Sequence, residues 1–346
     1  MKKLILSLIA VAVGTLSSFA QSDLVATLSH GSSFSTFSGI DALAQAYEAA
    51  VEGDVITLSP GVFNAVNIEK AITVRGAGMQ PMESNGYVAT QLSGQMVVKV
   101  PSNTSSILTL EGVQVLGASS IGGNSLAPVH FIGVRFEKDV AAAGVSAYAT
   151  SCIFGTSLIS QFQISGITNG DQNTTLNCFN CVMVSASSSG HNSYSSVAKI
   201  VAKNCIFRVG WDRLPYSSLT SCIVMSGDTG DNAPLSETCN AHNCIGINTR
   251  YTPNVFENIL DPSNTMAEGF NIFKTLTWLG KSPAFTETFE LTETAAATYL
   301  GDDGTQVGIY GGTNPFNPTP SNPQVKKFTV NSTIEGDQLK VKINVE

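Results

Sequence analysis

The feature that most constrains this chain is a short pattern that recurs through its middle. Five copies place cysteine between a small polar residue and Ile or Val, and two earlier copies have Val in place of cysteine. The copies begin at Gly112, Gly133, Ser151, Asn180, Asn204, Ser221 and Asn243. Their mean period is about 22 residues, within the range of solenoid repeats. A unit of this length cannot bury its apolar face alone, so we expect successive copies to stack.

Alternation along a strand places each repeat cysteine and the residue two positions later on the same face. Stacking in register then puts equivalent side chains about 4.8 Å apart. We therefore predict a cysteine ladder inside a dry core, made of Cys152, Cys181, Cys205, Cys222 and Cys244. The Asn or Ser before each cysteine suits a bend, because its side chain can hydrogen-bond nearby backbone. Cys178 and Cys239 lie outside this frame and are the candidates for a disulfide.

The first twenty residues have the pattern of a secretory signal. Lys2 and Lys3 precede an apolar run, and Ser18-Phe19-Ala20 has small residues at the positions of a cleavage site. The run is too short to span a bilayer, and no later stretch reaches 18 consecutive apolar residues. We therefore expect a secreted, periplasmic or cell-surface protein without a membrane span, cleaved near Ala20.

The rest of the chain changes character at its two ends. Apolar residues at helical spacing predict a helix that covers the open end of a solenoid. Four prolines between Asn314 and Pro323 predict a semi-rigid linker. The alternating segments on both sides of Glu335-Gly336-Asp337 predict a hairpin. The predicted units are a signal peptide (1–20), a polar leader (21–38), a capping helix (39–52), a parallel β-helix of about 12 coils (53–312), a linker (313–324) and a C-terminal β-hairpin (325–346).

Composition narrows the range of partners. The formal net charge is −8 and charged residues make up 13% of the chain. Nucleic-acid binding requires basic patches that release counterions, so this balance argues against it. The hairpin is marginal by itself, so residues 325–346 are expected to pack on the rod or to bind a protein partner. A disordered tail is the alternative.

Several segments resemble right-handed parallel β-helix proteins of the pectin-lyase-like superfamily. These are the opening from Gly39 to Phe63 with Ile72-Thr73-Val74-Arg75-Gly76, the Asn-Cys-Ile-Phe copies, and the ending at Val307-Gly308-Ile309-Tyr310-Gly311-Gly312. The resemblance covers most of the chain after the signal and implies an all-β solenoid. Its handedness follows from the resemblance and from the general rule for parallel crossovers.

The resemblance implies no single activity, because that superfamily contains lyases, hydrolases and non-catalytic members. The lyases use acidic calcium ligands with a Lys or Arg base on adjacent coils. Between Val140 and Met225 the only acids are Asp171 and Asp212. The hydrolases use several Asp residues and a Gly-His-Gly segment, which Ser189-Gly190-His191-Asn192 matches incompletely. The pair Asp302-Asp303 is expected at the far end of the rod.

The richest local group follows the third cysteine copy, in a loop expected to leave the coil from Arg208 onward. It combines an aromatic plate, a carboxylate and two guanidinium groups, with a second aromatic ring close behind. Aromatic rings suit sugar faces, and Arg offers two donors to a uronate carboxylate. The residues are Arg208, Trp211, Asp212, Arg213 and Tyr216. A surface Arg–Asp pair beside a Trp packed on the coil is the alternative.

Other candidate groups are smaller. His191 is a candidate for proton transfer with Tyr194 as a sugar contact, and a solvated loop is the alternative. Lys199 and Lys203 are expected on one strand face, where they would meet an acidic glycan or only solvent. Asp228 and Asp231 are candidate calcium ligands, although a Gly-Asp turn is the default, so no cofactor or metal is assigned. His130 and His242 are expected in hydrogen-bonded turns near the starts of repeats.

These observations favour a binding protein over an enzyme. The leading hypothesis is an exported β-helix that binds a polysaccharide or another cell-surface partner along one sheet face without catalysis. The second is a polysaccharide lyase or glycoside hydrolase that acts on an acidic glycan, with catalytic candidates Asp212, Arg213, Arg208, Lys199, Lys203 and His191. The third is a structural or adhesive spacer docked by its C-terminal hairpin.

Overall fold

The fold is taken from a computed structural model. It describes residues 24–81, 88–99, 106–122, 128–138, 140–154, 175–184, 199–209, 217–226, 233–234, 239–247, 249–250, 256–257, 262–263, 271–275, 287–318, 325–330 and 341–345. The signal peptide predicted over 1–20 lies outside these residues. None of the helices in the described part is long and apolar enough to cross a membrane.

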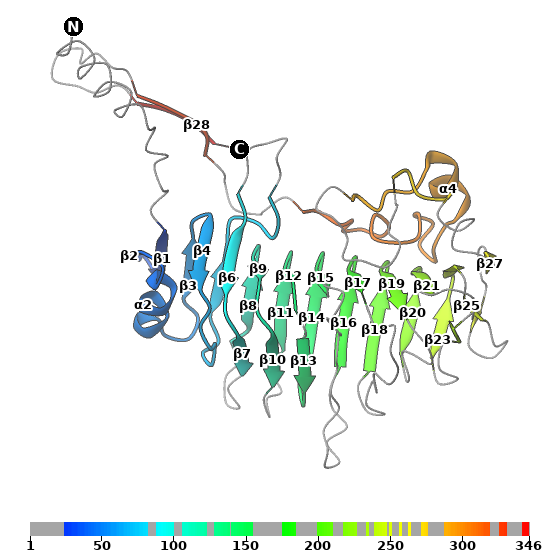
Figure 1. The fold of residues 1–346 in the computed structure, drawn as a ribbon, viewed down its shortest axis with the longest axis horizontal. Coiled ribbons are helices and arrows are strands. Elements are labelled where there is room, and N and C mark those ends of the chain that lie inside the picture. The colour runs from blue at the N-terminus through cyan, green and yellow to red at the C-terminus, as the bar shows by residue number, and fades with distance from the viewer. Residues whose placement is uncertain are drawn as a thin grey trace, which may run out of the picture.

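Two long sheets and one short sheet form the body of the molecule (Figure 1). The 12-stranded sheet has the order β2 (Ser33–Ser38), β1 (Val25–His30), β3 (Val55–Leu58), β5 (Thr73–Arg75), β8 (Leu108–Glu111), β11 (Val129–Ile132), β14 (Ser146–Thr150), β16 (Thr175–Phe179), β18 (Lys199–Lys203), β20 (Ser218–Thr220), β23 (Asn240–His242) and β26 (Phe256–Glu257). The strands from β3 to β26 pair in parallel.

The second long sheet has ten strands, all paired in parallel. Its order is β4 (Gly61–Asn64), β6 (Thr90–Ser93), β9 (Gln114–Val115), β12 (Arg135–Phe136), β15 (Ile153–Phe154), β17 (Val182–Val184), β19 (Ile206–Val209), β21 (Ile223–Ser226), β24 (Ile245–Ile247) and β27 (Pro262–Ser263). The 3-stranded sheet contains β7 (Met96–Lys99), β10 (Ser119–Gly122) and β13 (Val140–Ala143). A small parallel pair joins β22 (Ala233–Pro234) to β25 (Thr249–Arg250).

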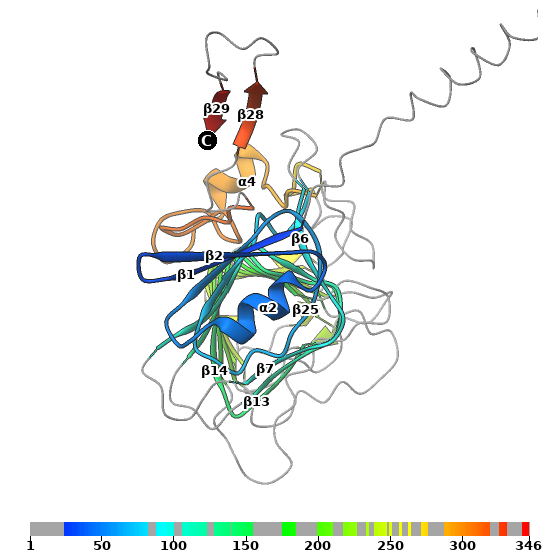
Figure 2. The ribbon, with the colours of Figure 1, turned by 90° about the vertical axis from the view of Figure 1, so that its left-hand side faces the viewer.

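The chain alternates between the two long sheets along most of its length. Each strand of the 12-stranded sheet from β8 to β20 is followed after one bend by a strand of the 10-stranded sheet. Viewed from the end, the sheets surround a common interior (Figure 2). The structure is thus mostly β with long parallel sheets, which is compatible with the predicted all-β parallel β-helix.

The bend between the two long sheets uses one backbone conformation in every copy. The seven residues that begin the repeat copies have φ between 49° and 61°, in the left-handed region. Gly and Asn adopt this region most easily, which explains their predominance at these positions. The prediction that these residues form bends is confirmed.

The cysteine after each bend connects neighbouring copies through its thiol. The backbone N–H of Cys181 donates to Sγ of Cys205 at 3.4 Å, and the N–H of Cys205 donates to Sγ of Cys222 at the same distance. The same contact runs from Cys152 to Cys181 and from Cys222 to Cys244. Each thiol in turn donates to the carbonyl two residues earlier, at 3.2–3.3 Å. The ladder therefore satisfies backbone groups that leave the sheet at the bend.

All seven cysteines are buried free thiols, including Cys178 and Cys239, which were the disulfide candidates. Burial raises the pKa of the Cys152 and Cys205 thiols, so both are protonated at neutral pH. Burial likewise raises the pKa of Cys239, to about 12. The thiols thus serve as small apolar side chains that retain a weak donor and a weak acceptor.

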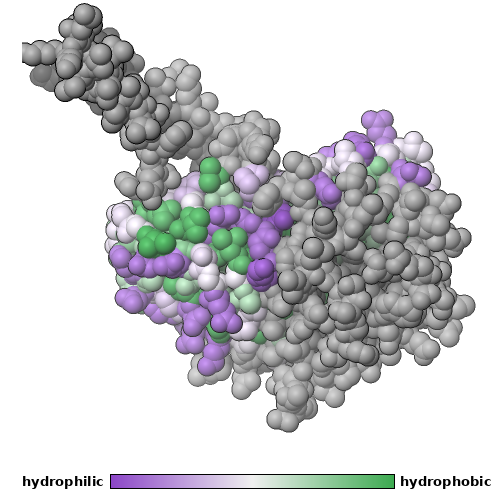
Figure 3. Space-filling view, viewed as in Figure 1, coloured by the Kyte–Doolittle hydropathy of each residue, from purple (hydrophilic) through white to green (hydrophobic). Residues whose placement is uncertain are grey.

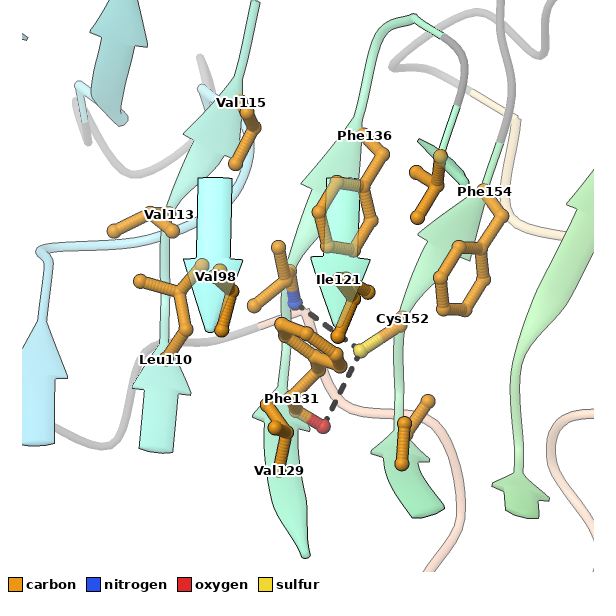
Figure 4. Packing of buried hydrophobic residues seen from close by; sticks show 14 of the residues in the cluster. Val98, Leu110, Val113, Val115, Ile121, Val129, Phe131, Phe136, Cys152 and Phe154 are labelled. Carbon is orange, nitrogen blue, oxygen red and sulfur yellow. Dashed lines mark hydrogen bonds between the residues drawn. The ribbon is translucent and has the colours of Figure 1, made fainter. Parts of the chain in front are cut away.

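Aromatic and aliphatic side chains fill the space between the sheets (Figure 4). Phe136 and Phe154 stack across neighbouring strands with ring centroids 5.2 Å apart, and Phe131 meets Phe136 edge-on at 5.4 Å. The Phe131 carbonyl is a second acceptor near the Cys152 thiol, at 3.4 Å from Sγ, in the same region. The residue two positions after the repeat cysteine thus points inward, as the alternation predicts.

The N-terminal end differs from the predicted polar leader. Residues 25–38 form a regular antiparallel hairpin of β1 and β2, and β1 also pairs antiparallel with β3. Helix α2 (Ala42–Ala49) follows and buries Ala42, Leu43 and Ala46 in the core. It lies across the open end of the sheets (Figure 2), in the position predicted for a cap. The prediction for residues 21–38 named only a polar leader and no secondary structure. The alternation in residues 25–30 is the local signal for β1.

The C-terminal end also differs from the predicted coils. We expected coils to continue to Gly312, but within residues 287–318 no strand joins the long sheets. This segment, which contains α4 (Glu293–Thr298), instead packs on the outer face of the 10-stranded sheet. We call residues 287–318 the strap. The row that it covers consists of Ile153, Val182, Ile206, Ile223 and Ile245, the residues directly after the repeat cysteines.

The strap also binds the row of bend residues. Nδ2 of Asn180 donates to the carbonyls of Ile309 and Gly311 at 2.8 and 2.7 Å. The strap therefore runs back along the body toward its N-terminal end, where the N–H of Asn317 donates to Oγ of Ser151 at 3.4 Å. A Cβ at Gly311 would collide with the carbonyl of Gln306, which explains that glycine. Phe316 and Asn317, which fall within the predicted semi-rigid linker (313–324), thus belong to the strap.

The predicted C-terminal hairpin is present as an antiparallel pair of β28 (Val325–Val330) and β29 (Val341–Val345). Its register sets Phe328 opposite Ile343 and Val330 opposite Val341. Strand alternation puts these four residues on one face of the pair.

The thiol ladder predicts that removing one sulfur acceptor lowers the free energy of unfolding. Cys205→Val keeps an apolar side chain of a type that already occupies this position at Val113 and Val134, but it leaves the N–H of Cys181 without its sulfur acceptor. We expect a loss of about 1–3 kcal/mol in the free energy of unfolding, the usual cost of a buried unsatisfied donor. Chemical denaturation measures it.

Cys239→Val is the matched control. Cys239 is equally buried, and no backbone N–H donates to its sulfur in the described contacts. An equal loss in both variants would show that the sulfur acceptor contributes nothing.

Candidate functional site

An exposed aromatic patch lies on the outer face of the 12-stranded sheet. Strands β11, β14 and β16 bury every second residue in the core, so the residues between them point outward. The patch, called here the aromatic patch, consists of His130, Ile132, Tyr148, Thr150, Asn177 and Phe179. Ile132, Tyr148 and Phe179 are exposed by 39%, 38% and 39%. These are large exposures for apolar side chains in the middle of a sheet, and together they form one surface.

The parallel register organises the patch into two rows. His130 lies opposite Tyr148, and Tyr148 lies opposite Asn177. The second row contains Ile132, Thr150 and Phe179. Neighbouring strands are about 4.8 Å apart, so both rows run along the long axis of the sheet, across the strands.

The first row combines ring faces with hydrogen-bonding groups. The rings of His130 and Tyr148 have centroids 5.3 Å apart and are tilted by 52°. Partial burial lowers the pKa of His130, so its imidazole is neutral at pH 7. Nδ2 of Asn177 donates to the carbonyl of Ala147 at 3.4 Å, which orients the amide. A neutral imidazole, a phenol, an amide and a hydroxyl can each donate or accept a hydrogen bond.

The patch carries no formal charge, and the described charges beside it are paired. On one side, Nε of Arg75 contacts Oε2 of Glu111 at 2.8 Å. On the other side, Nζ of Lys203 contacts Asp302 at 3.3 Å and Asp303 at 3.4 Å. An uncharged, partly aromatic surface with hydrogen-bonding groups suits a ligand that has apolar faces and hydroxyl edges.

Lys203 is the one predicted catalytic residue whose side chain is described, and it serves the strap. Desolvation acts to lower its pKa, but the hydrogen bonds and charges of Asp302 and Asp303 outweigh this effect and raise it. Asp302 also accepts from Oγ of Ser221 at 2.9 Å. The acidic pair thus lies against the C-terminal part of the 12-stranded sheet, beside β18 and the end of β20, with β23 and β26 still beyond it.

The remaining predicted site residues fall outside the described part. For Lys199 and Arg208 only the side chain falls outside it; the other residues are Trp211, Asp212, Arg213, Tyr216, His191, Tyr194, Asp228 and Asp231. The backbone of Lys199 lies in β18, in a strand as expected. β19 continues to Val209, so Arg208 lies in a strand and not in the loop expected to begin there. Among the described residues, no group of three or more His, Cys, Asp or Glu side chains is placed to hold a metal ion.

His130 was expected in a turn, but it lies within β11 and faces outward. The sequence does contain a signal for the patch. Outward positions lie one and three residues before each bend residue, which selects Ile132 and His130 before Gly133 and Phe179 and Asn177 before Asn180. The predicted repeat comprised only the bend residue and those after it, so it did not include these outward positions before the bend.

Comparison with family models, with curated proteins and with solved structures finds no match for this chain.

The contacts of the strap predict a pH-dependent stability. Hydrogen bonds from the side chain and backbone of Thr305, with a smaller contribution from Lys203, lower the pKa of Asp303. An acid whose pKa is lowered on folding stabilises the fold above its unfolded pKa, near 3.9, and loses this contribution as the pH falls through the folded value. Asp303→Asn should therefore lower the thermal midpoint at pH 7, and the difference should shrink as the pH falls below about 3.9.

Glu48→Gln on the exposed side of α2 is the control, because it removes one carboxylate far from the strap. Thermal unfolding followed by circular dichroism from pH 7 to pH 3 measures both variants. A difference between Asp303→Asn and the parent chain that persists unchanged at pH 3 would exclude this ionic role.

Proposed function

We propose that this protein is an exported right-handed parallel β-helix, a solenoid of about 12 coils like those of the pectin-lyase-like superfamily, and that it binds carbohydrate. The repeat period of about 22 residues and the alternation of strands between two parallel sheets support the solenoid. The signal-like N-terminus supports export. In this proposal the ligand is a polysaccharide or cell-surface glycan that lies along the aromatic patch, and the protein acts as a binder and not as an enzyme.

The observation that carries the proposal is the exposure of Tyr148 and Phe179 on neighbouring strands beside hydrogen-bonding side chains. Contact between these rings and a ligand removes apolar surface from water, which stabilises the complex by about 25 cal/mol per Å² of apolar area buried. Sugar rings offer apolar faces for this purpose and hydroxyl groups for Asn177, Thr150 and His130. A binding role is preferred over catalysis because Asp171 and Asp212 are the only acids between Val140 and Met225.

The charge pattern favours a neutral glycan over an acidic one. A uronate polymer needs cations to balance its carboxylates, and Arg75 and Lys203, the described cations beside the patch, are already paired with acids. Binding of a neutral ligand does not depend on screened charges, so its affinity should be insensitive to salt. Acidic glycans form the comparison arm of the test.

The C-terminal hairpin supports a separate attachment role. Strands β28 and β29 form a two-stranded hairpin, which is marginal in water by itself. A protein partner at residues 325–346 would stabilise the hairpin and hold the glycan-binding body in place.

Single substitutions in the aromatic patch test the proposal. Tyr148→Ala and Phe179→Ala should each weaken binding of a neutral polysaccharide by about 2- to 10-fold, the effect of losing one ring contact. Affinity electrophoresis and calorimetry against neutral and uronate polymers, at low and high salt, provide the measurement. Leu300→Ala on the strap removes an exposed apolar side chain outside the patch and outside β2, and should leave the affinity unchanged.

Retention on neither class of polymer, or equal loss in the Leu300→Ala control, would refute binding at this patch. Release of reducing ends or unsaturated products during incubation would instead support the enzyme hypothesis.

A further inference from the structure

At the N-terminal end of the body, none of the described residues pairs with the outer edge of the 12-stranded sheet. Strand β2 is the last strand of the 12-stranded sheet and has one neighbour, β1. Its six residues pair with β1 without a bulge. The sequence Ser33-Phe34-Ser35-Thr36-Phe37-Ser38 contains no charge and no proline. Natural proteins protect exposed edges with Lys, Pro, bulges or a covering element, and β2 has none of the first three while all its residues except Phe37 are exposed.

The free edge presents a defined set of backbone groups. His30 and Ser33 flank a two-residue loop, which closes on a hydrogen-bonded pair. Residues of β2 with odd numbers therefore bond to β1, and the N–H of Gly39, which donates to the Leu24 carbonyl at 2.8 Å, continues this series. The backbone groups of Phe34, Thr36 and Ser38 consequently point to the free edge.

Apolar side chains accompany this edge. Phe34 is 70% exposed, the largest exposure of any large apolar residue in the described part of the chain. Ile40 and Val51, on either side of α2, are exposed by 51% and 52%. Figure 3 shows apolar groups among polar ones over this end of the molecule. Such a grouping marks an interaction site more often than scattered single residues do.

Strands β1 and β2 and helix α2 together form the N-terminal end of the body. β1 and β2 extend the sheet beyond β3 by two strand spacings, roughly 10 Å. This equals the diameter of a helix with its side chains, about 10 Å. α2 and β2 both lie at this end of the body (Figure 1).

We propose that β2 pairs antiparallel with β2 of a second copy of this chain, in a head-to-head dimer with two-fold symmetry. Several registers meet the two conditions below, and we propose the one that pairs all three edge-facing residues. Opposite residues of an antiparallel pair have their side chains on the same face. At a hydrogen-bonded position, the backbone N–H and C=O groups of both residues point to the shared edge. With Thr36 opposite its own copy, Phe34 lies opposite Ser38 and all three edge-facing residues form hydrogen-bonded pairs.

A second copy fits this edge better than an unrelated strand. The pairing is isologous, so each chain supplies the same residues and no edge is left open at the junction. A Thr–Thr pair at the axis is a favourable cross-strand contact. The same two-fold axis brings Ile40 and Val51 at the cap of one protomer toward the cap of the other, which adds apolar burial to the backbone pairing.

The mass of the full chain in solution tests the dimer. Sedimentation equilibrium should give a dimer for the parent chain. Thr36→Pro removes one N–H on the free edge and none that bonds to β1, and Phe34→Lys adds a charge at the junction. Each should raise the dimer dissociation constant at least about tenfold. Leu300→Lys, at a residue 42% exposed on the strap, is the control and should leave it unchanged.

Cross-linking tests the register independently. Because the seven native cysteines are buried, an introduced surface cysteine is the reactive one. Thr36→Cys should cross-link to its copy with a short bismaleimide, since paired Cβ atoms are about 5 Å apart. Ser33→Cys should not, because its copies would be roughly 20 Å apart.

A monomeric parent chain at all concentrations would overturn the proposal. So would a dimer that survives both edge substitutions while circular dichroism shows a folded protein. Cross-linking through Ser33→Cys but not through Thr36→Cys would refute this register.

Discussion

The structure depends on the left-handed bend that separates the two long sheets. At this bend the backbone leaves one sheet before it joins the other, and the N–H of the next residue finds no strand partner. The cysteine thiol of the following copy accepts that N–H, as Sγ of Cys205 does for Cys181 at 3.4 Å. The same thiol donates to a carbonyl of its own copy. A side chain small enough for the core but able to bond in both directions explains why cysteine recurs here.

The outer side of the bend is stabilised by the strap. The bend amide of Asn180 and the bend hydroxyl of Ser221 bind the strap directly, while the residues after the repeat cysteines present an aliphatic row that the strap covers. Beyond the strap the same row becomes polar, although Gln114 and Arg135 are still buried. Gln91 donates to Gln114 at 2.7 Å, and Arg135 contacts Glu137 at 2.6 Å. The strap thus packs on the aliphatic part of the row, and side-chain pairing satisfies the polar part.

The body leaves two kinds of surface that its own packing does not explain. On the aromatic patch, Tyr148 and Phe179 remain exposed among uncharged hydrogen-bonding groups. At the N-terminal end, β2 has a free edge beside Phe34. The first surface runs along the body and suits an extended ligand, whereas the second lies at its end and suits association. Dimerisation through β2 would align two patches in one continuous sheet and lengthen the binding surface.

The sequence alone determined the features that repeat locally. The period, the inward cysteines and the bends follow from alternation and from the φ preferences of Gly and Asn, which act within a few residues. Tertiary structure decided everything that depends on contacts between distant segments. The strap bonds across more than a hundred residues, as from Asn180 to Ile309, so no local pattern in residues 287–318 distinguishes it from further coils. The aromatic patch likewise exists only because stacking brings His130, Tyr148 and Phe179 from three separate copies onto one face.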